Sequence, residues 1–334
     1  MIRITGGNSS GRRWAGWLAA VGLALSALVG MMGTATTASA ATGMSAAAGA
    51  AATASLPTIT GVERQEKVSH FNSAAAKSVT VACPGTKKVI NASGSIVAGA
   101  NDVLLDEIYP SKDLTSVTVT GKETDDATTH NASWAVEAIA ICADPPSGLK
   151  RYFASSPDDK TSPKFAEKSC PPSKAVLGTG MDIIGGQGQA WASTIIPGVD
   201  RTTGQIFGVT VDATADAANP PTGKWHVNAF AICADDVYRQ QVLSADGEML
   251  SDLGQLILHC PFGTVATGTG YDTDPFDASS DEIITYQIDP GGSSGSHGSG
   301  SSPPDSNFLK TFQKDAKVST FTLVRDYVIC ASGG

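Results

Sequence analysis

The sequence predicts an all-β protein in which three sequence repeats form a pseudo-threefold, β-prism-like body. Three observations support this prediction. Apolar residues recur with the period of a strand, one cysteine-framed pattern occurs three times, and a small sheet from one repeat cannot bury its apolar face alone. A β-trefoil-like fold ranks second because its repeats are roughly half as long. A β-sandwich with loosely repeated halves is the third alternative.

The first forty residues have the three parts of an export signal. The basic residues Arg3, Arg12 and Arg13 precede an apolar run over residues 14–32, and the small residues 38–40 follow it. We expect cleavage after Ala40 and no stable membrane anchor afterwards. The adjacent arginines leave twin-arginine export open beside the ordinary secretory route.

Residues 41–60 are mainly Ala, Thr, Ser and Gly, a composition typical of a flexible tether. The remaining residues, 61–334, are predicted to form a single three-repeat β domain. Its repeats span about 62–145, 150–236 and 237–334.

The exported chain is acidic. Removal of the three basic residues of the signal from the total of 23 leaves 20 basic against 32 acidic side chains, a formal charge of −12. Nucleic acids and anionic membranes require a cationic surface, so the charge disfavours both as partners. An extracellular glycan or protein is the partner that we expect.

Each repeat is framed by two cysteines. It opens on a Cys-Pro pair, continues to a glycine ten or eleven residues later, and closes on an apolar strand that begins eight residues before the second cysteine. The opening cysteines are Cys83, Cys170 and Cys260, the glycines are Gly94, Gly180 and Gly270, and the closing cysteines are Cys142, Cys233 and Cys330.

The closing segment shows the alternation of a strand. From Trp134 to Cys142, the residues Trp134, Val136, Ala138 and Ala140 fall on one face, and the intervening residues fall on the other. With similar alternation before each proline and between the two segments, we expect about four strands in each repeat. Each repeat would then form one small antiparallel sheet, and the three sheets would pack around a common axis.

The six cysteines allow 15 disulfide connectivities. None of them stands in a Cys-x-x-Cys or Cys/His spacing, so structural bridges in an oxidising, extracellular compartment are the best explanation. The repeat register favours Cys83–Cys142, Cys170–Cys233 and Cys260–Cys330. The rival connectivity joins neighbouring repeats through Cys142–Cys170 and Cys233–Cys260, with Cys83–Cys330 closing the ring.

The Cys-Pro-x-Gly opening, the Gly-x-Gly turn and the Ile-Cys-Ala end resemble a repeat of secreted actinobacterial proteins. The layout is also distantly similar to the vitelline membrane outer layer protein I family. The resemblance covers about residues 62–334 and implies a threefold β-prism.

The candidate site residues are few. Asp272, Asp274 and Asp277 form the densest carboxylate cluster, the place where a hard cation such as calcium would bind. Trp191 follows a Gly/Gln-rich loop and is the candidate for stacking on a sugar; Tyr152, Phe153 and Tyr271 are similar candidates. Trp134 and Trp225 occupy equivalent repeat positions, so we expect them to pack in the core.

No catalytic residue is predicted, because the sequence has no Gly-x-Ser-x-Gly elbow and no spaced metal triad. The leading hypothesis is a non-enzymatic extracellular protein with a structural or binding role. A carbohydrate-binding module is the alternative, and a secreted hydrolase comes third.

Overall fold

The computed structural model describes residues 56–99, 102–124, 132–249, 253–273, 283–291, 303–314 and 322–334, all in the compact unit Thr53–Gly334. The expected export signal over residues 1–40 lies outside these ranges. No helix in the described ranges is long and apolar enough to cross a membrane.

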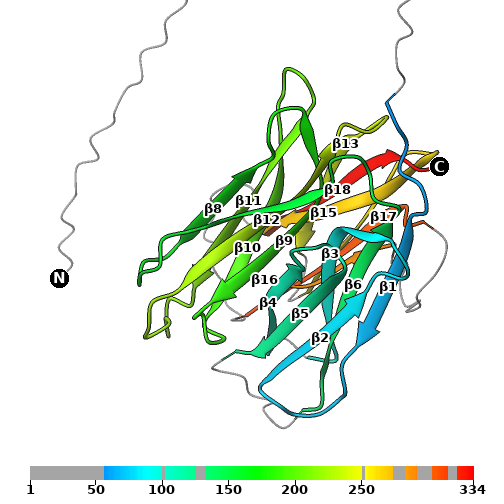
Figure 1. Ribbon diagram of the computed structural model, residues 1–334. Helices are drawn as coiled ribbons and strands as arrows, with labels where there is room; N and C mark the ends of the chain where they lie inside the picture. Colours follow the sequence, from blue (N-terminus) through cyan, green and yellow to red (C-terminus); the bar gives the residue numbers. More distant parts are fainter. Residues whose placement is uncertain are drawn as a thin grey trace, which may run out of the picture. The chain divides into compact units, whose positions relative to one another are not determined.

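The described residues form eighteen strands and no helix, which confirms the all-β prediction (Figure 1). The strands are β1 (Glu63–Val68), β2 (Ala76–Ala82), β3 (Lys88–Val97), β4 (Val103–Pro110), β5 (Ser116–Glu123), β6 (Ala135–Ala143), β7 (Lys150–Ser155), β8 (Lys164–Ser169), β9 (Lys174–Ile184), β10 (Ala190–Val199), β11 (Ile206–Ala215), β12 (His226–Asp235), β13 (Gln241–Met249), β14 (Leu253–His259), β15 (Thr264–Asp272), β16 (Ile283–Pro290), β17 (Ser306–Gln313) and β18 (Thr322–Ser332).

These strands form three six-stranded antiparallel sheets. Sheet I has the order β1-β6-β3-β16-β17-β14, sheet II the order β2-β5-β4-β9-β12-β7, and sheet III the order β13-β18-β15-β10-β11-β8. Strands β1–β6, β7–β12 and β13–β18 make up the first, middle and last third of the domain. Each third supplies three strands to each of two sheets. Figure 1 shows one result, the pairing of β3 with β16.

The expectation of four strands and one sheet for each repeat is therefore wrong. Each third has six strands, and the two strands that begin it lie at sheet edges. Edge strands bury less apolar surface, so their sequence alternation is weaker, as the part-exposed β7 illustrates. The sequence of a single strand does not predict the pairings β3–β16, β4–β9 and β10–β15, because the backbone groups of any strand can pair with those of any other.

The strand register also corrects the expected alignment of glycines. Ser95, Asp182 and Asp272 each lie twelve residues after the opening cysteine and pair with the neighbouring third. Gly94 therefore corresponds to Met181 and Tyr271. It does not correspond to Gly180 and Gly270.

The three sheets meet at a buried polar network around Asn91, which stands where the other thirds have Gly178 and Gly268. The Asn91 amide nitrogen donates to Thr269 Oγ1 at 3.1 Å, and its oxygen accepts from the backbone N–H of Thr179 at 3.1 Å. A Cβ at Gly178 would lie 2.0 Å from the carbonyl oxygen of Ile90. Backbones from different sheets approach so closely here that a side chain fits in one third only.

The disulfides are Cys83–Cys142, Cys170–Cys233 and Cys260–Cys330, the connectivity that the repeat register favours. The rival pairing between neighbouring repeats does not form. In each third, the opening cysteine directly follows the second strand, which lies at the edge of one sheet. The closing cysteine lies in the sixth strand, which belongs to another sheet. The three bonds thereby connect sheet II to I, III to II and I to III.

The folded body begins before residue 61, the start expected from the sequence. Ile59 is 1% exposed, donates its N–H to the Ser332 carbonyl and accepts from Gly334 N–H, so it belongs to the folded body. Ile59 packs against the C-terminal strand although it adjoins the Ala/Thr/Ser/Gly segment, and the composition of that segment did not predict this contact.

Candidate functional site

A pocket of about 570 Å³ opens beside the Cys170–Cys233 disulfide. Its walls come from the turn before β9, the β10–β11 hairpin and the segment that joins β12 to β13. Leu56 contributes an apolar side chain to it, and Ser173, Gln205, Asp236 and Arg239 contribute polar ones.

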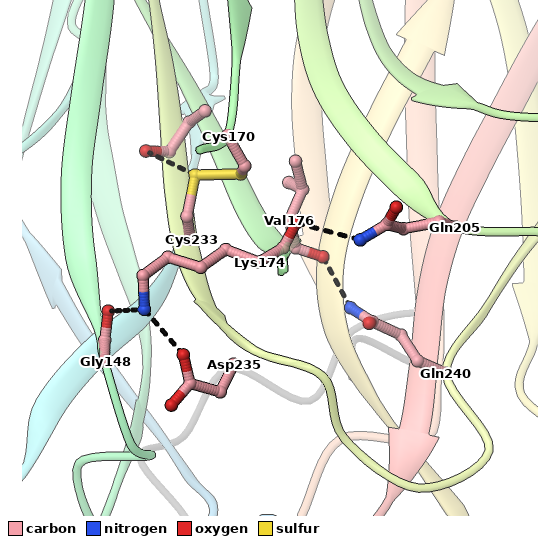
Figure 2. Close-up of a disulfide and its surroundings, with 9 residues drawn as sticks. Gly148, Cys170, Lys174, Val176, Gln205, Cys233, Asp235 and Gln240 are labelled. Atoms are coloured by element: carbon pink, nitrogen blue, oxygen red, sulfur yellow. Dashed lines mark hydrogen bonds and ion pairs between the residues drawn. A yellow bond between two sulfur atoms is a disulfide. The ribbon is translucent and has the colours of Figure 1, made fainter. Parts of the chain in front are cut away.

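Two glutamines connect the walls of this pocket (Figure 2). Gln205 Nε2 donates to the Lys174 carbonyl at 3.3 Å, and Gln240 Nε2 donates to the Val176 carbonyl at 2.6 Å. The Lys174 side chain points away from them and binds Asp235 at 2.6 Å and the Gly148 carbonyl at 3.1 Å. Lys174 therefore links the start of β9 to the end of β12.

The pocket offers a polar surface with both charges. Arg239 is exposed and has φ of 56°, while Asp236 is half-buried. The lining residues include no His or Cys, and therefore no His- or Cys-based nucleophile pair. Its chemistry suits a small polar molecule held by hydrogen bonds.

A second surface lies on sheet II, where rings from three strands surround one guanidinium. We call Tyr109, Arg151, Phe153 and Phe230 the aromatic patch. The Arg151 Cζ lies 4.8 Å from the ring centroids of Tyr109 and Phe230 and 5.9 Å from that of Phe153. Arg151 also donates to the Pro110 carbonyl at 2.6 Å. Phe153 is 55% exposed, so the patch reaches solvent.

A glycine makes the patch possible. Phe153 lies opposite Phe230, which lies opposite Gly180 on β9. Tyr109 approaches from β4, beyond β9, and its ring packs edge-on against Phe230 with centroids 5.2 Å apart. Because Gly180 has no side chain, the two rings meet across the intervening strand.

On sheet I, the position equivalent to Arg151 is occupied by Arg64, which has different neighbours. Arg64 and Arg151 each lie opposite the isoleucine that precedes the closing cysteine. Arg64 forms ion pairs with Glu66 and Asp289. The corresponding residues around Arg151 are Phe153 and Tyr109. Among the described residues, Arg151 has no carboxylate partner.

A polar row borders the patch on the side away from Arg151. It contains Glu107, Thr120, Asp182 and Asn228, with Asn228 Nδ2 donating to Asp182 Oδ2 at 3.3 Å and Thr120 donating to Glu107 at 2.6 Å. Burial raises the pKa of both Glu107 and Asp182, and the hydrogen bonds from Thr120 and Asn228 oppose this. The row presents acceptors and an amide within reach of solvent.

Trp191 is not a surface ring, so its expected role in sugar stacking is wrong. It is 2% exposed and packs with Leu104, Ile284 and Phe312. Leu104, Trp191 and Ile284 each stand six residues before the proline in their strand. The Gly/Gln-rich loop before Trp191 suggested exposure, but the ring occupies an apolar position that all three thirds direct inward.

Trp134 and Trp225 are buried, which confirms the prediction that they pack in the core. Each is covered by a buried lysine, Lys77 at 3.8 Å and Lys164 at 5.3 Å from the ring centroid. Both ammonium groups also donate to backbone carbonyls, Lys77 to those of Asn72 and Trp134.

The calcium candidates receive no support from geometry. Asp272 is buried in β15, and Asp274 and Asp277 lie outside the described residues. Within the described ranges, no group of three or more His, Cys, Asp or Glu side chains is placed to hold a metal ion.

The other aromatic candidates differ. Tyr271 is buried and donates its hydroxyl to the Ala192 carbonyl at 2.9 Å, whereas Tyr152 is half-buried and lies 5.4 Å from Lys150 Nζ. Only Phe153 joins the aromatic patch. Sequence reasoning missed Tyr109, Arg151 and Phe230. A comparison of the three thirds position by position gives the missing signal, since the matching residues on sheet I are Asp289, Arg64 and Ile139.

Comparison with known proteins finds neither a matching family model nor a matching curated protein.

Proposed function

We propose that the chain is a secreted, non-enzymatic binding protein whose body is a pseudo-threefold β-prism. The three sheets share one strand order once the thirds are matched, and this regularity supports the prism. The three disulfides are consistent with an extracellular location, because such bonds persist in oxidising compartments.

The observation that carries the proposal is the aromatic patch. Equivalent positions on the matched sheets have different side chains, an Arg64–Glu66–Asp289 ion cluster on sheet I and an arginine with rings on sheet II. Phe153 is exposed beside an arginine that has no carboxylate partner among the described residues, so an apolar ring and a cation lie together at the surface. Aromatic and arginine side chains are enriched at binding surfaces.

A carbohydrate ligand is the second candidate. A sheet face with an exposed ring and a neighbouring row of carboxylate, amide and hydroxyl groups can stack on a sugar and bind its hydroxyls. In this candidate function, Phe153 is the stacking ring, because the expected ring, Trp191, is buried.

The hydrolase alternative has less support. The pair Glu107 and Asp182 lies on a sheet face, while Asp106 is buried and pairs with Lys122 at 2.8 Å. A hydrolase requires two carboxyls that face each other across a substrate.

The test combines binding and turnover. The secreted protein is passed through native gels containing extracellular polysaccharides and is incubated with the same polymers and a peptide panel. We expect retardation in at least one gel, loss of it in Phe153→Ala, and no product. Product release by the wild type would overturn the non-enzymatic assignment, and equal mobility of Phe153→Ala and wild type in every gel would overturn the patch.

A further inference from the structure

We infer that the aromatic patch on sheet II binds a glycan that carries carboxylate groups, with a carboxylate at Arg151 and a sugar face on Phe153. This inference rests on the proposed binding function and names the ligand class.

The charge at Arg151 is the first argument. At the equivalent position, Arg64 lies between two carboxylates, Glu66 and Asp289, with Asp289 at 2.9 Å. On sheet II both carboxylates are replaced by rings, which leaves the Arg151 guanidinium with one carbonyl, that of Pro110. Its planar fork matches a carboxylate in geometry. A ligand carboxylate would restore the neutralisation that sheet I has internally.

The second argument is the pre-set orientation of Arg151. Its guanidinium stacks on Tyr109 and Phe230, and the Pro110 carbonyl holds one nitrogen. Little rotamer freedom remains to be lost when an anion binds, so the site is preorganised.

The third argument selects a glycan over an acidic peptide. Beyond Phe153, the next row has Glu107, Asp182 and Asn228. These groups accept hydrogen bonds from hydroxyls and would repel a run of carboxylates. Residues two apart on a strand are separated by roughly 7 Å, so Arg151 and this row lie roughly 13 Å apart. Arg151, the Phe153 ring and the acceptor row follow one another across the sheet. A short oligosaccharide with both carboxylates and hydroxyls matches this order.

The acidic net charge, −9 for the full sequence, does not prevent this contact. At physiological ionic strength the screening length is about 8 Å, so groups in contact with the ligand dominate over distant surface charge.

The experiment uses three polymers in native gels: hyaluronan, in which a carboxylate-bearing sugar alternates with an uncharged one, the same polymer after reduction of its carboxyls to alcohols, and polyglutamate. We expect hyaluronan to retard the wild type with about tenfold higher affinity than the reduced polymer, as for one charge-assisted hydrogen-bond pair. Arg151→Met should remove this preference and keep the weaker binding to the reduced polymer. Phe153→Ala should weaken binding to both polymers.

The matched control is Lys310→Met on sheet I, where a cation also lies over a ring, with Lys310 Nζ 4.8 Å from the Phe308 centroid. This variant should bind as the wild type does, and thermal unfolding shows whether each variant is folded. Equal affinity for the carboxylated and reduced polymers would overturn the ligand class but leave a binding function through Phe153. Preference for polyglutamate would overturn it in favour of an acidic protein. Failure to bind either sugar polymer, with Phe153→Ala unchanged in every assay, would overturn the proposed function as well.

Discussion

Asn307 donates a hydrogen bond of 2.6 Å to Asp326 between sheets I and III, where the other two thirds of the domain have only apolar residues. The residues that correspond to Asn307 are Val117 and Val209, and those that correspond to Asp326 are Ala138 and Ala229. Asp326 is fully buried, and its second oxygen has no hydrogen-bond partner among the described residues. Burial raises the pKa of Asp326 to about 8.

The Asp326 carboxyl should make the protein less stable as the pH rises. Its folded pKa of about 8 lies above the unfolded value of about 4, so its contribution is complete below pH 4 and declines through pH 8. The loss is at most about 5 kcal/mol. Asp326→Asn should remove this decline and be more stable than wild type at pH 8. Urea unfolding at pH 5, 6.5 and 8 measures the effect.

The effects of Asp326 and Asp106 fall in different pH ranges. Burial raises the pKa of Asp106 to about 6. Asp326→Asn should still lose some stability between pH 4 and 6 through Asp106. If the variant and the wild type lose the same stability between pH 6.5 and 8, Asp326 is already ionised in the fold. The double variant Asn307→Val/Asp326→Ala, which copies the other thirds, should be more stable than wild type at pH 8.

Lys77 and Lys164 should both contribute to stability because they occupy the same position in two thirds, and Lys164 has an additional ion pair with Asp159. Each stands six residues before the opening cysteine and covers a tryptophan. Replacement of either by Met removes charge-assisted hydrogen bonds to carbonyls and a cation–π contact, at an expected cost of about 2 kcal/mol. Thermal and urea unfolding measure the loss. Lys112→Met, at an exposed turn, is the control and should stay within about 0.5 kcal/mol of wild type. A loss no larger than that of the control would refute the structural role.

Each disulfide should stabilise the domain by a similar amount. The bonds close segments of 59, 63 and 70 residues, for which the chain-entropy model gives about 4 kcal/mol each. Replacement of both cysteines of one pair by Ala should lower the free energy of unfolding by that amount. Non-reducing peptide mapping of the wild type provides the independent check. A peptide linking Cys142 to Cys170 would contradict the structure.

Gly178 should tolerate no side chain, because the carbonyl oxygen that its Cβ would meet belongs to the backbone of another sheet. We expect Gly178→Ala to cost more than about 3 kcal/mol or to prevent recovery of folded protein. Gly223→Ala is the matched control, since no atom lies within 4 Å of its added Cβ. The control should be recovered in the wild-type yield and unfold at the wild-type temperature or slightly above it. Equal yields of the two variants would show that the sheets can separate at Gly178.

The sequence by itself determined the class of secondary structure, and its repeat register favoured the observed cysteine pairing while it left the rival pairing open. Side-chain alternation is a local property of a strand, and the equal spacing of Trp134 and Trp225 from their closing cysteines marks equivalent core positions. The burial of these tryptophans follows from that equivalence.

The tertiary structure alone decided which strands are neighbours and what lies on each face. Backbone hydrogen bonds pair β3 with β16 across nearly two hundred residues, and no local pattern distinguishes that partner from another. Trp191 is buried because equivalent residues of all three thirds converge on it. The aromatic patch exists only where β4, β7 and β12 lie in one sheet with Gly180 between the rings. A site made from three distant segments is set by packing, which sequence periodicity does not record.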